Sequence, residues 1–306
     1  MQAIQCKNIR KTYEGMVAVD EINFEVQKAE LFGLIGPDGA GKTSIFRILT
    51  TLLIPDSGRA FIDGMDVVKE YKEIRRRIGY MPGKFSLYQD LSVEENLNFF
   101  ATIFGTTIEE NYHLIEPIYK QIESFKKRKA GALSGGMKQK LALSCALIHS
   151  PSVLVLDEPT TGVDAVSRKE FWEMLKDLQK KGISIIVSTP YMDEASLCDR
   201  VALIQKGKIM SIASPVEIIQ SFGEKLFAIR SLNMLNLSRI LKSLDTKTSI
   251  YPFGQFIHYT DSRGDVSAEV LLHELEKHRV EKLEVKEISP SVEDCFMKLM
   301  TEANVG

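Results

Sequence analysis

The chain has 306 residues and a mass of 34.4 kDa, more than one hydrophobic core usually serves, so a large domain with a smaller one is expected. Hydrophobic residues make up 44% and charged residues 26%, values that exclude a disordered chain, a collagen and a disulfide scaffold. The formal net charge of -2 excludes a whole-molecule field that would attract nucleic acid or an anionic membrane.

The 4 cysteines lie far apart and form no CxxC pair or Cys/His cluster at metal-ligand spacing. We therefore expect them to be reduced packing residues of a cytosolic protein. The N-terminal segment lacks the apolar stretch of a signal peptide, and apolar runs such as 153–156 are far too short to cross a bilayer. The chain by itself is expected to be soluble.

Short apolar runs alternate with helical patterns from residue 1 to about 215, which is typical of an α/β domain with a partly parallel sheet. The runs 31–35, 153–156 and 183–187 are nearly continuous in apolar residues and predict buried strands. The pattern is helical between about 84 and 150, where Ser92 and Glu95 form a capping box. We expect a helical subdomain inserted into the α/β core there.

The pattern changes after Ser214-Pro215, because Phe222-Gly223 interrupts the chain and shorter elements begin. Strand patterns lie at 226–230, 248–253, 255–260 and 283–285, and helical patterns at 237–244, 268–275 and 292–300. The order βαββαβ predicts a small split-βαβ (ferredoxin-like) α+β domain. We therefore expect two domains, residues 1–221 and residues 222–306.

The segment 36–43, GPDGAGKT, matches the phosphate-loop pattern and lies between a strand and a helical run, as that motif requires. Glycines let the backbone curl so that several N–H groups and a helix N-terminus face one polyphosphate. Lys42 is expected to bridge terminal phosphates, and the Thr43 hydroxyl to ligate Mg²⁺. The alternative is a glycine-rich turn with a chance lysine. The residues expected to bind nucleotide here are Gly36, Asp38, Gly39, Ala40, Gly41, Lys42, Thr43 and Ser44.

Two carboxylates, Asp157 and Glu158, end the apolar strand 153–156. This pattern predicts Asp157 in the shell of Mg²⁺ and Glu158 beside the reacting phosphate, as general base or water-positioning group. Neighbouring side chains on a regular strand point to opposite faces, so both can serve one site only if the backbone turns at the strand's end. The alternative is a surface Asp-Glu pair before a proline turn.

The segment 133–139, LSGGMKQ, opens a helical pattern that runs through Leu147. Ser134 is a natural N-cap, and Gly135 and Gly136 expose N–H groups, so this helix start is a candidate second anion site. In isolation, an ordinary helix start is the better explanation.

Together and in this order, the three motifs resemble those of the ATP-binding subunit of an ABC transporter, over residues 1 to about 220. The resemblance implies a head-to-tail ATPase dimer, in which the phosphate loop of one subunit faces the helix that Ser134 opens in the other and two ATP molecules lie between them. It also implies that Tyr13 stacks on adenine, that Asp164 belongs to a loop coupling the two sites, and that the helical subdomain contacts a membrane permease. For Tyr13 the alternative is an ordinary strand-end tyrosine.

Asp38 and the segments 81–97 and 133–141 are also similar to the first ATPase half of ABC-2-type multidrug exporters, whose two halves are unequal. The resemblance implies an ATPase on the inner face of the cell membrane that uses ATP and Mg²⁺ to power a separate permease for export. The resemblance also implies a second ABC ATPase as partner, in a heterodimer or alternatively a homodimer. No nucleic-acid partner is expected.

Two positions depart from the family pattern. Gly83 stands where the family has a glutamine that contacts Mg²⁺ and the attacking water, with Lys84 or Gln89 as alternative polar groups. Pro190 stands where a histidine donates to the γ-phosphate, and proline has neither a side-chain donor nor an N–H. Each absence is expected to slow turnover on the order of a hundredfold. With Thr189 as N-cap, Pro190 also predicts a helix start.

Two other functions stay open from the sequence. A soluble ABC ATPase that acts on ribosomes or DNA would normally bring a second ATPase or a basic extension in the same chain, and neither is seen. A non-catalytic regulatory module that binds ATP as a dimerisation switch is favoured by Gly83 and Pro190, whereas Asp157 and Glu158 argue against total inactivity. The basic runs 75–77 and 126–129 are expected to be solvated faces rather than lipid or RNA contacts.

Overall fold

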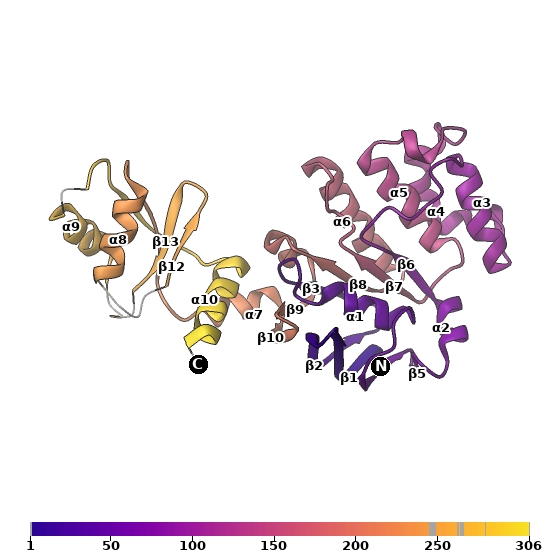
Figure 1. Cartoon of the computed structure of the whole chain (residues 1–306). Helices are drawn as coiled ribbons and strands as arrows, with labels where there is room; N and C mark the ends of the chain where they lie inside the picture. Colours follow the sequence, from indigo (N-terminus) through magenta and orange to yellow (C-terminus); the bar gives the residue numbers. More distant parts are fainter. Residues whose placement is uncertain (1, 245–248, 262, 264–265, 279, 306) are drawn as a thin grey trace. The chain divides into compact units, whose positions relative to one another are not determined.

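The computed structural model describes residues 2–244, 249–261, 263, 266–278 and 280–305, with side chains up to residue 301. The chain forms two compact units, Met1–Ser214 and Pro215–Gly306, each with its own β-sheet structure (Figure 1). None of the helices in the described residues has the length and apolar character needed to cross a bilayer.

The central sheet of the first unit has six strands in the order β10-β9-β3-β8-β7-β6. Neighbouring strands from β9 to β6 are parallel, and β10 is antiparallel to β9. The predicted strands at 31–35, 153–156 and 183–187 are confirmed as β3, β7 and β8, all fully buried. The strand bounds are β3 Leu31–Ile35, β6 Ile78–Met81, β7 Val153–Asp157, β8 Ser184–Thr189, β9 Arg200–Gln205 and β10 Lys208–Ala213.

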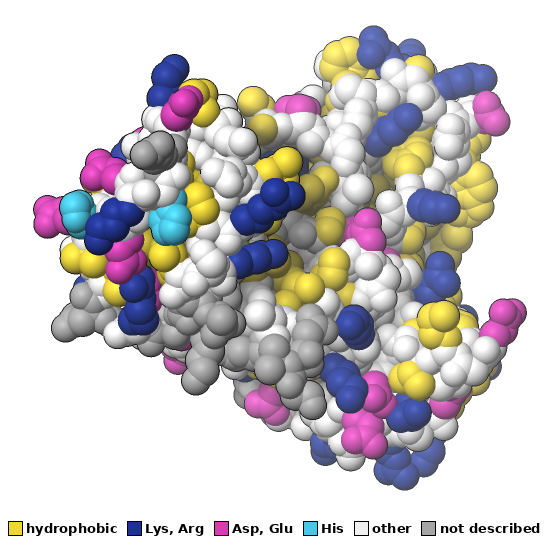
Figure 2. Space-filling view, turned by 60° about the vertical axis from the view of Figure 1, so that its left-hand side comes forward, with side chains coloured by type: hydrophobic (Ala, Val, Ile, Leu, Met, Phe, Trp, Pro, Cys, Tyr) yellow, Lys and Arg dark blue, Asp and Glu magenta, His cyan; other side chains and the backbone are white. Residues whose placement is uncertain are grey.

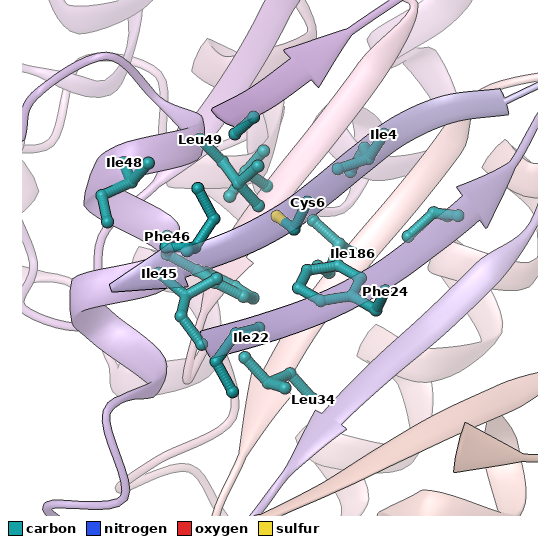
Figure 3. Packing of buried hydrophobic residues seen from close by; sticks show 14 of the residues in the cluster. Ile4, Cys6, Ile22, Phe24, Leu34, Ile45, Phe46, Ile48, Leu49 and Ile186 are labelled. Carbon is teal, nitrogen blue, oxygen red and sulfur yellow. The ribbon is translucent and has the colours of Figure 1, made fainter. Parts of the chain in front are cut away.

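A second, antiparallel sheet of this unit has the order β2-β1-β4-β5, which the sequence analysis did not identify. Its strands are β1 Gln2–Tyr13, β2 Met16–Gln27, β4 Ser57–Ile62 and β5 Met65–Asp66, followed by helix α2 Tyr71–Arg77. Helix α1, Lys42–Leu49, packs between residues of this sheet, such as Ile4 and Ile22, and residues of the central sheet, such as Leu34 and Ile186 (Figure 3). Apolar burial therefore fixes α1, the helix that begins with Lys42.

Helices α3 Val93–Phe104, α4 Ile108–Glu123 and α5 Gly135–Leu147, with the 3-10 helix η1 Ala130–Ala132, occupy the segment expected to be a helical subdomain (Figure 1). The predicted capping box is confirmed, because the Ser92 hydroxyl accepts from the Glu95 N–H at 3.2 Å and the Glu95 carboxylate accepts from the Ser92 N–H at 2.7 Å. Helix α6, Ala165–Lys180, then follows β7.

The second unit has one four-stranded sheet, order β12-β13-β11-β14, in which all neighbours are antiparallel. The predicted order of strands and helices from residue 226 onward is confirmed. Position 248 lies outside the described residues, and β13 begins at Phe256, one residue later than predicted, because Gly254 makes the turn at φ 58°. The bounds are α7 Pro215–Gln220, β11 Leu226–Arg230, α8 Met234–Leu244, β12 Ile250–Phe253, β13 Phe256–Thr260, α9 Ala268–Glu276, β14 Glu284–Ile288 and α10 Val292–Val305.

The division between the units falls after Ser214, seven residues before the predicted boundary, because α7 belongs with α10. The Cys295 thiol donates to the carbonyl of Ile218 at 3.3 Å, and the Lys298 ammonium donates to the carbonyl of Phe222 at 2.7 Å. All four cysteines are buried and unpaired, and burial raises the pKa of the Cys6 thiol.

These contacts predict different behaviour for two shortened chains. A chain ending at Ser214 should fold and stay in solution, whereas one ending at Ser221 should aggregate more readily, because α7 then exposes Ile218, which is only 2% exposed in the full chain. Size-exclusion chromatography combined with thermal unfolding measures both properties. Failure of the chain ending at Ser214 to fold would show that the first unit is not independent.

Candidate functional site

The predicted phosphate loop connects β3 to α1, and the neighbouring backbone leaves no room for a side chain at Gly36 or Gly41. A Cβ on Gly36 would lie 2.1 Å from the carbonyl oxygen of Ile204, so no side chain fits there. Gly41 has φ 101°, a left-handed conformation, and its Cβ would lie 2.3 Å from the carbonyl oxygen of Ala18. Between them, the Ala40 N–H donates to the Pro37 carbonyl at 3.2 Å, so the loop closes on itself.

Lys42 lies at the first position of α1, and its side chain is only 3% exposed. Its ammonium donates to the carbonyl of Gly36 at 2.8 Å and to that of Pro37 at 3.0 Å. The same nitrogen lies 3.1 Å from Oε1 of Glu158, which makes an ion pair. The loop thus curls around a positive charge, and two predicted site residues that are far apart in sequence lie together.

The two carboxylates at the end of β7 occupy different environments. Asp157 is 2% exposed, and its Oδ1 accepts from the Ser188 hydroxyl at 2.7 Å. Glu158 has φ 49°, in the left-handed region, and its N–H donates to the Ser188 carbonyl at 3.1 Å. The predicted backbone turn at the strand's end is therefore confirmed, and it brings the Glu158 side chain to Lys42.

Tyr13, at the end of β1, lies beside the start of α1. Its hydroxyl is 3.2 Å from the hydroxyl of Ser44, its side chain is 40% exposed, and the Lys11 ammonium lies 5.9 Å from the ring centroid. An aromatic face is thus available next to the phosphate loop. The structure brings Tyr13 and Ser44 together as two members of the predicted site.

The helix start at 134–136 packs against α6. The predicted N-cap is confirmed, since the Ser134 hydroxyl accepts from the Met137 N–H at 3.4 Å. A Cβ on Gly136 would lie 2.6 Å from the hydroxyl of Ser167, so glycine permits this close packing. Asp164 caps α6 by accepting from the Ser167 N–H at 3.0 Å, and these backbone bonds hold the pKa of Asp164 below its ordinary value. Two helix N-termini therefore lie side by side.

Gly83 lies against the chain at Asp157 and Glu158, since its Cβ would be 3.2 Å from the backbone carbonyl oxygen of Asp157 and 3.8 Å from Cβ of Glu158. The predicted helix start at Pro190 is wrong. Thr189 stays in β8, paired with Ile35 of β3, and the next helix is the 3-10 helix η2, Met192–Leu197, with Tyr191 as its N-cap. Sheet pairing at the strand's end outweighs the local capping preference.

Sequence analysis missed the roles of Ser188 and Glu194. Ser188 is completely buried and pairs with Asp157 across neighbouring parallel strands, so the signal was the apolar strand directly before it. Glu194 is 3% exposed, and its carboxylate accepts hydrogen bonds from the hydroxyl groups of Thr160 and Thr189. Nothing in the local sequence distinguishes Glu194 from an exposed glutamate.

Comparisons with known proteins agree with this geometry. The family model described as ABC transporter matches residues 19–161. The probable multidrug ABC transporter ATP-binding protein YbhF of Escherichia coli is 40% identical over 217 residues, which cover 70% of this chain and 38% of that protein. The linearmycin resistance ATP-binding protein LnrL of Bacillus subtilis is 30% identical over an alignment of length 308, which covers 97% of each chain. The chain thus matches less than two fifths of the first relative's length.

Among solved structures, a dimeric ATP-binding cassette in a post-hydrolysis state, bound to ADP and Pi, matches with a TM-score of 0.63 and 26% identity. The match covers 69% of this chain and 98% of that chain.

The left-handed backbone of Glu158 predicts an unusual order of stability between two variants. Glu158→Gly and Glu158→Ala both remove the carboxylate, but only glycine adopts φ 49° without strain, so Glu158→Gly should be more stable by about 1 kcal/mol. Urea unfolding of the two variants measures this difference in the free energy of unfolding. Equal stability, or a more stable Glu158→Ala, would contradict the strain.

Proposed function

This chain belongs to the ATP-binding proteins of ABC transporters, and we propose that it is the subunit that binds ATP to power a separate membrane permease. The observation that carries the proposal is the buried ammonium of Lys42 inside a loop that leads into the N-terminus of α1. Two loop carbonyls and Glu158 now contact this ammonium, and the oxygens of a terminal phosphate would replace them. Backbone N–H groups of the loop would hold the other phosphate oxygens.

We propose Mg²⁺ as the companion of ATP, held by Thr43 and Asp157. A hydroxyl and a carboxylate are oxygen donors of the kind that Mg²⁺ prefers. The fit is supported by the burial of Asp157 and by the bond from Ser188, which fixes its carboxylate at the end of β7. The bound ion would neutralise phosphate charge. Glu158 is then the group that orients the attacking water and accepts its proton.

The proposed partner within the ATPase is a second ABC ATPase. In a head-to-tail dimer, the N-terminus of α5, with Ser134, Gly135 and Gly136, would face the partner's phosphate loop. The dimeric state of the matched cassette with ADP and Pi supports this arrangement. We favour a heterodimer over a homodimer, because Gly83 and Pro190 leave this chain's own site without two polar groups. Its own hydrolysis should then be slow.

A second candidate function rests on the same two residues. If Gly83 and Pro190 prevent hydrolysis altogether, the chain is a regulatory half that closes the dimer by holding ATP. The ion pair between Lys42 and Glu158 favours the catalytic alternative, because it brings the proposed base to the group that would contact the terminal phosphate.

The proposed permease contact lies between the helical subdomain and the central sheet. A groove of about 590 Å³ there is lined mainly by apolar side chains, among them Met81, Phe85, Phe100, Ile103 and Ala142.

The names of the two relatives, a multidrug transporter protein and a resistance protein, support export as the direction of transport. Because the proposed partner is a membrane permease, the proposed location is cytoplasmic, at the inner face of the cell membrane.

The distribution of charge on one face of the molecule gives the soluble alternative little support. On the face shown in Figure 2, lysine and arginine side chains are dispersed among acidic and neutral ones and do not gather into one basic patch. A protein that acts on DNA or ribosomes would need a clustered positive surface.

For the second unit we propose the split-βαβ (ferredoxin-like) fold. Its element order β11-α8-β12-β13-α9-β14 and its strand order β12-β13-β11-β14 support this assignment. The relative from Bacillus subtilis aligns over 97% of this chain, so the alignment extends into the second unit.

Removal of the Lys42 ammonium tests nucleotide binding. Lys42→Ala should weaken binding of Mg²⁺-ATP at least about tenfold, or about 1.4 kcal/mol, because a buried positive charge at the phosphates is lost. Isothermal titration calorimetry measures the dissociation constant, and Lys180→Ala, which removes a lysine whose side chain is 75% exposed, is the matched control. An affinity equal to that of the parent chain would contradict the site.

The unequal dimer predicts unequal effects of two substitutions. Glu158→Gln should reduce steady-state ATPase activity of the assembled transporter only mildly, because the partner's complete site would do most of the hydrolysis. Ser134→Arg should be severe, because a bulky cation would enter the partner's phosphate site and disturb the N-cap of α5. If Glu158→Gln abolishes turnover as fully as Ser134→Arg, this chain's own site is essential and the asymmetry is wrong.

A further inference from the structure

Besides Asp157, a second carboxylate, that of Glu194, is buried close to the candidate site. It is not among the residues assigned to ATP. Oε2 of Glu194, in η2, accepts from the Thr189 hydroxyl at 2.5 Å and from the Thr160 hydroxyl at 3.0 Å. The exposed fractions are 3% for Glu194, 1% for Thr160 and 0% for Thr189. Both hydroxyls are therefore oriented by one charged acceptor away from water.

The charge of Glu194 is only partly compensated. Its Oε1 lies 3.8 Å from the Arg168 guanidinium and accepts no hydrogen bond within the described parts of the chain. Burial of a charge with so little compensation is unfavourable, and apolar side chains often replace such groups without loss of stability. We therefore expect Glu194 to contribute by fixing the positions of its two hydroxyl partners rather than by adding stability.

Glu194 joins the two backbone segments that frame the candidate site. Thr160 lies in the turn that follows Glu158, where the Thr161 N–H donates to the Glu158 carbonyl at 3.2 Å. Thr189 ends β8, and its carbonyl accepts from the N–H of Gly36, the first residue of the phosphate loop, at 3.3 Å. A single carboxylate thus ties the turn that carries Glu158 to the end of β8, which is hydrogen-bonded to the first residue of the phosphate loop.

We propose that Glu194 is a positioning residue for ATP hydrolysis, which holds the Glu158 turn on the end of β8 through Thr160 and Thr189. The inference rests on the proposed ATPase function. The Thr189 hydroxyl also holds the chain around Pro190. It accepts a hydrogen bond from the Tyr191 N–H at 3.0 Å, so it fixes the chain on both sides of the proline.

The test removes each hydroxyl without changing side-chain shape. Thr160→Val and Thr189→Val should speed amide hydrogen exchange in residues 156–163 of the nucleotide-free chain about tenfold, because the Glu158 turn loses its tie. The same variants should bind Mg²⁺-ATP within twofold of the parent and hydrolyse it about tenfold more slowly in single-turnover reactions. Thr160→Ser should restore both rates. The matched control is Thr50→Val, which removes another buried hydroxyl, one that donates to the Phe46 carbonyl.

The outcomes separate this proposal from the function on which it rests. Exchange at the parent's rate in both valine variants, or equal acceleration in Thr50→Val, would overturn the tie. Faster exchange with unchanged hydrolysis would overturn the positioning role. A parent chain that binds no ATP would instead contradict the proposed function, and the exchange rates would still decide whether Glu194 holds the turn.

Discussion

The structure of the site depends on parallel pairing at one edge of the central sheet. Because β7 and β8 run in the same direction and in register, Asp157 stands opposite Ser188, and because β3 pairs with β8, Ile35 stands opposite Thr189. The phosphate loop, the carboxylate turn and the segment that begins at Pro190 therefore all leave the sheet at one edge. No side chain of the site needs to reach across the molecule.

Apolar strands and short motifs allow much of this arrangement to be predicted from the sequence. The run 153–156 predicts a strand buried on both faces, and the two carboxylates after it predict a turn, which appears as the left-handed Glu158. The antiparallel sheet of β1, β2 and β4 escapes prediction, because bulges in the pairing of β1 with β2 interrupt the alternation of buried and exposed positions, and β4 pairs with β1 across a long stretch of chain.

The rest of the site could not be predicted from the sequence, because it depends on contacts between side chains that are distant in sequence. Glu194 and Thr160 are 34 positions apart, and a glutamate on a short helix gives no sign of burial until β8 and the Glu158 turn are placed. The boundary between the units is a similar case. Serine, proline and glycine mark interruptions near 214 and 223, but only the bonds from α10 assign α7 to the second unit.

The enclosure of α1 between two sheets has a consequence for the energetics of ligand binding. Ile45, Phe46, Ile48 and Leu49 of this helix are at most 1% exposed, so the helix is fully ordered before any ligand arrives. The entropy of fixing its backbone is already compensated by folding. The free energy of contact with a polyphosphate is then available as affinity, since none of it goes into ordering the helix whose N-terminus receives the charge.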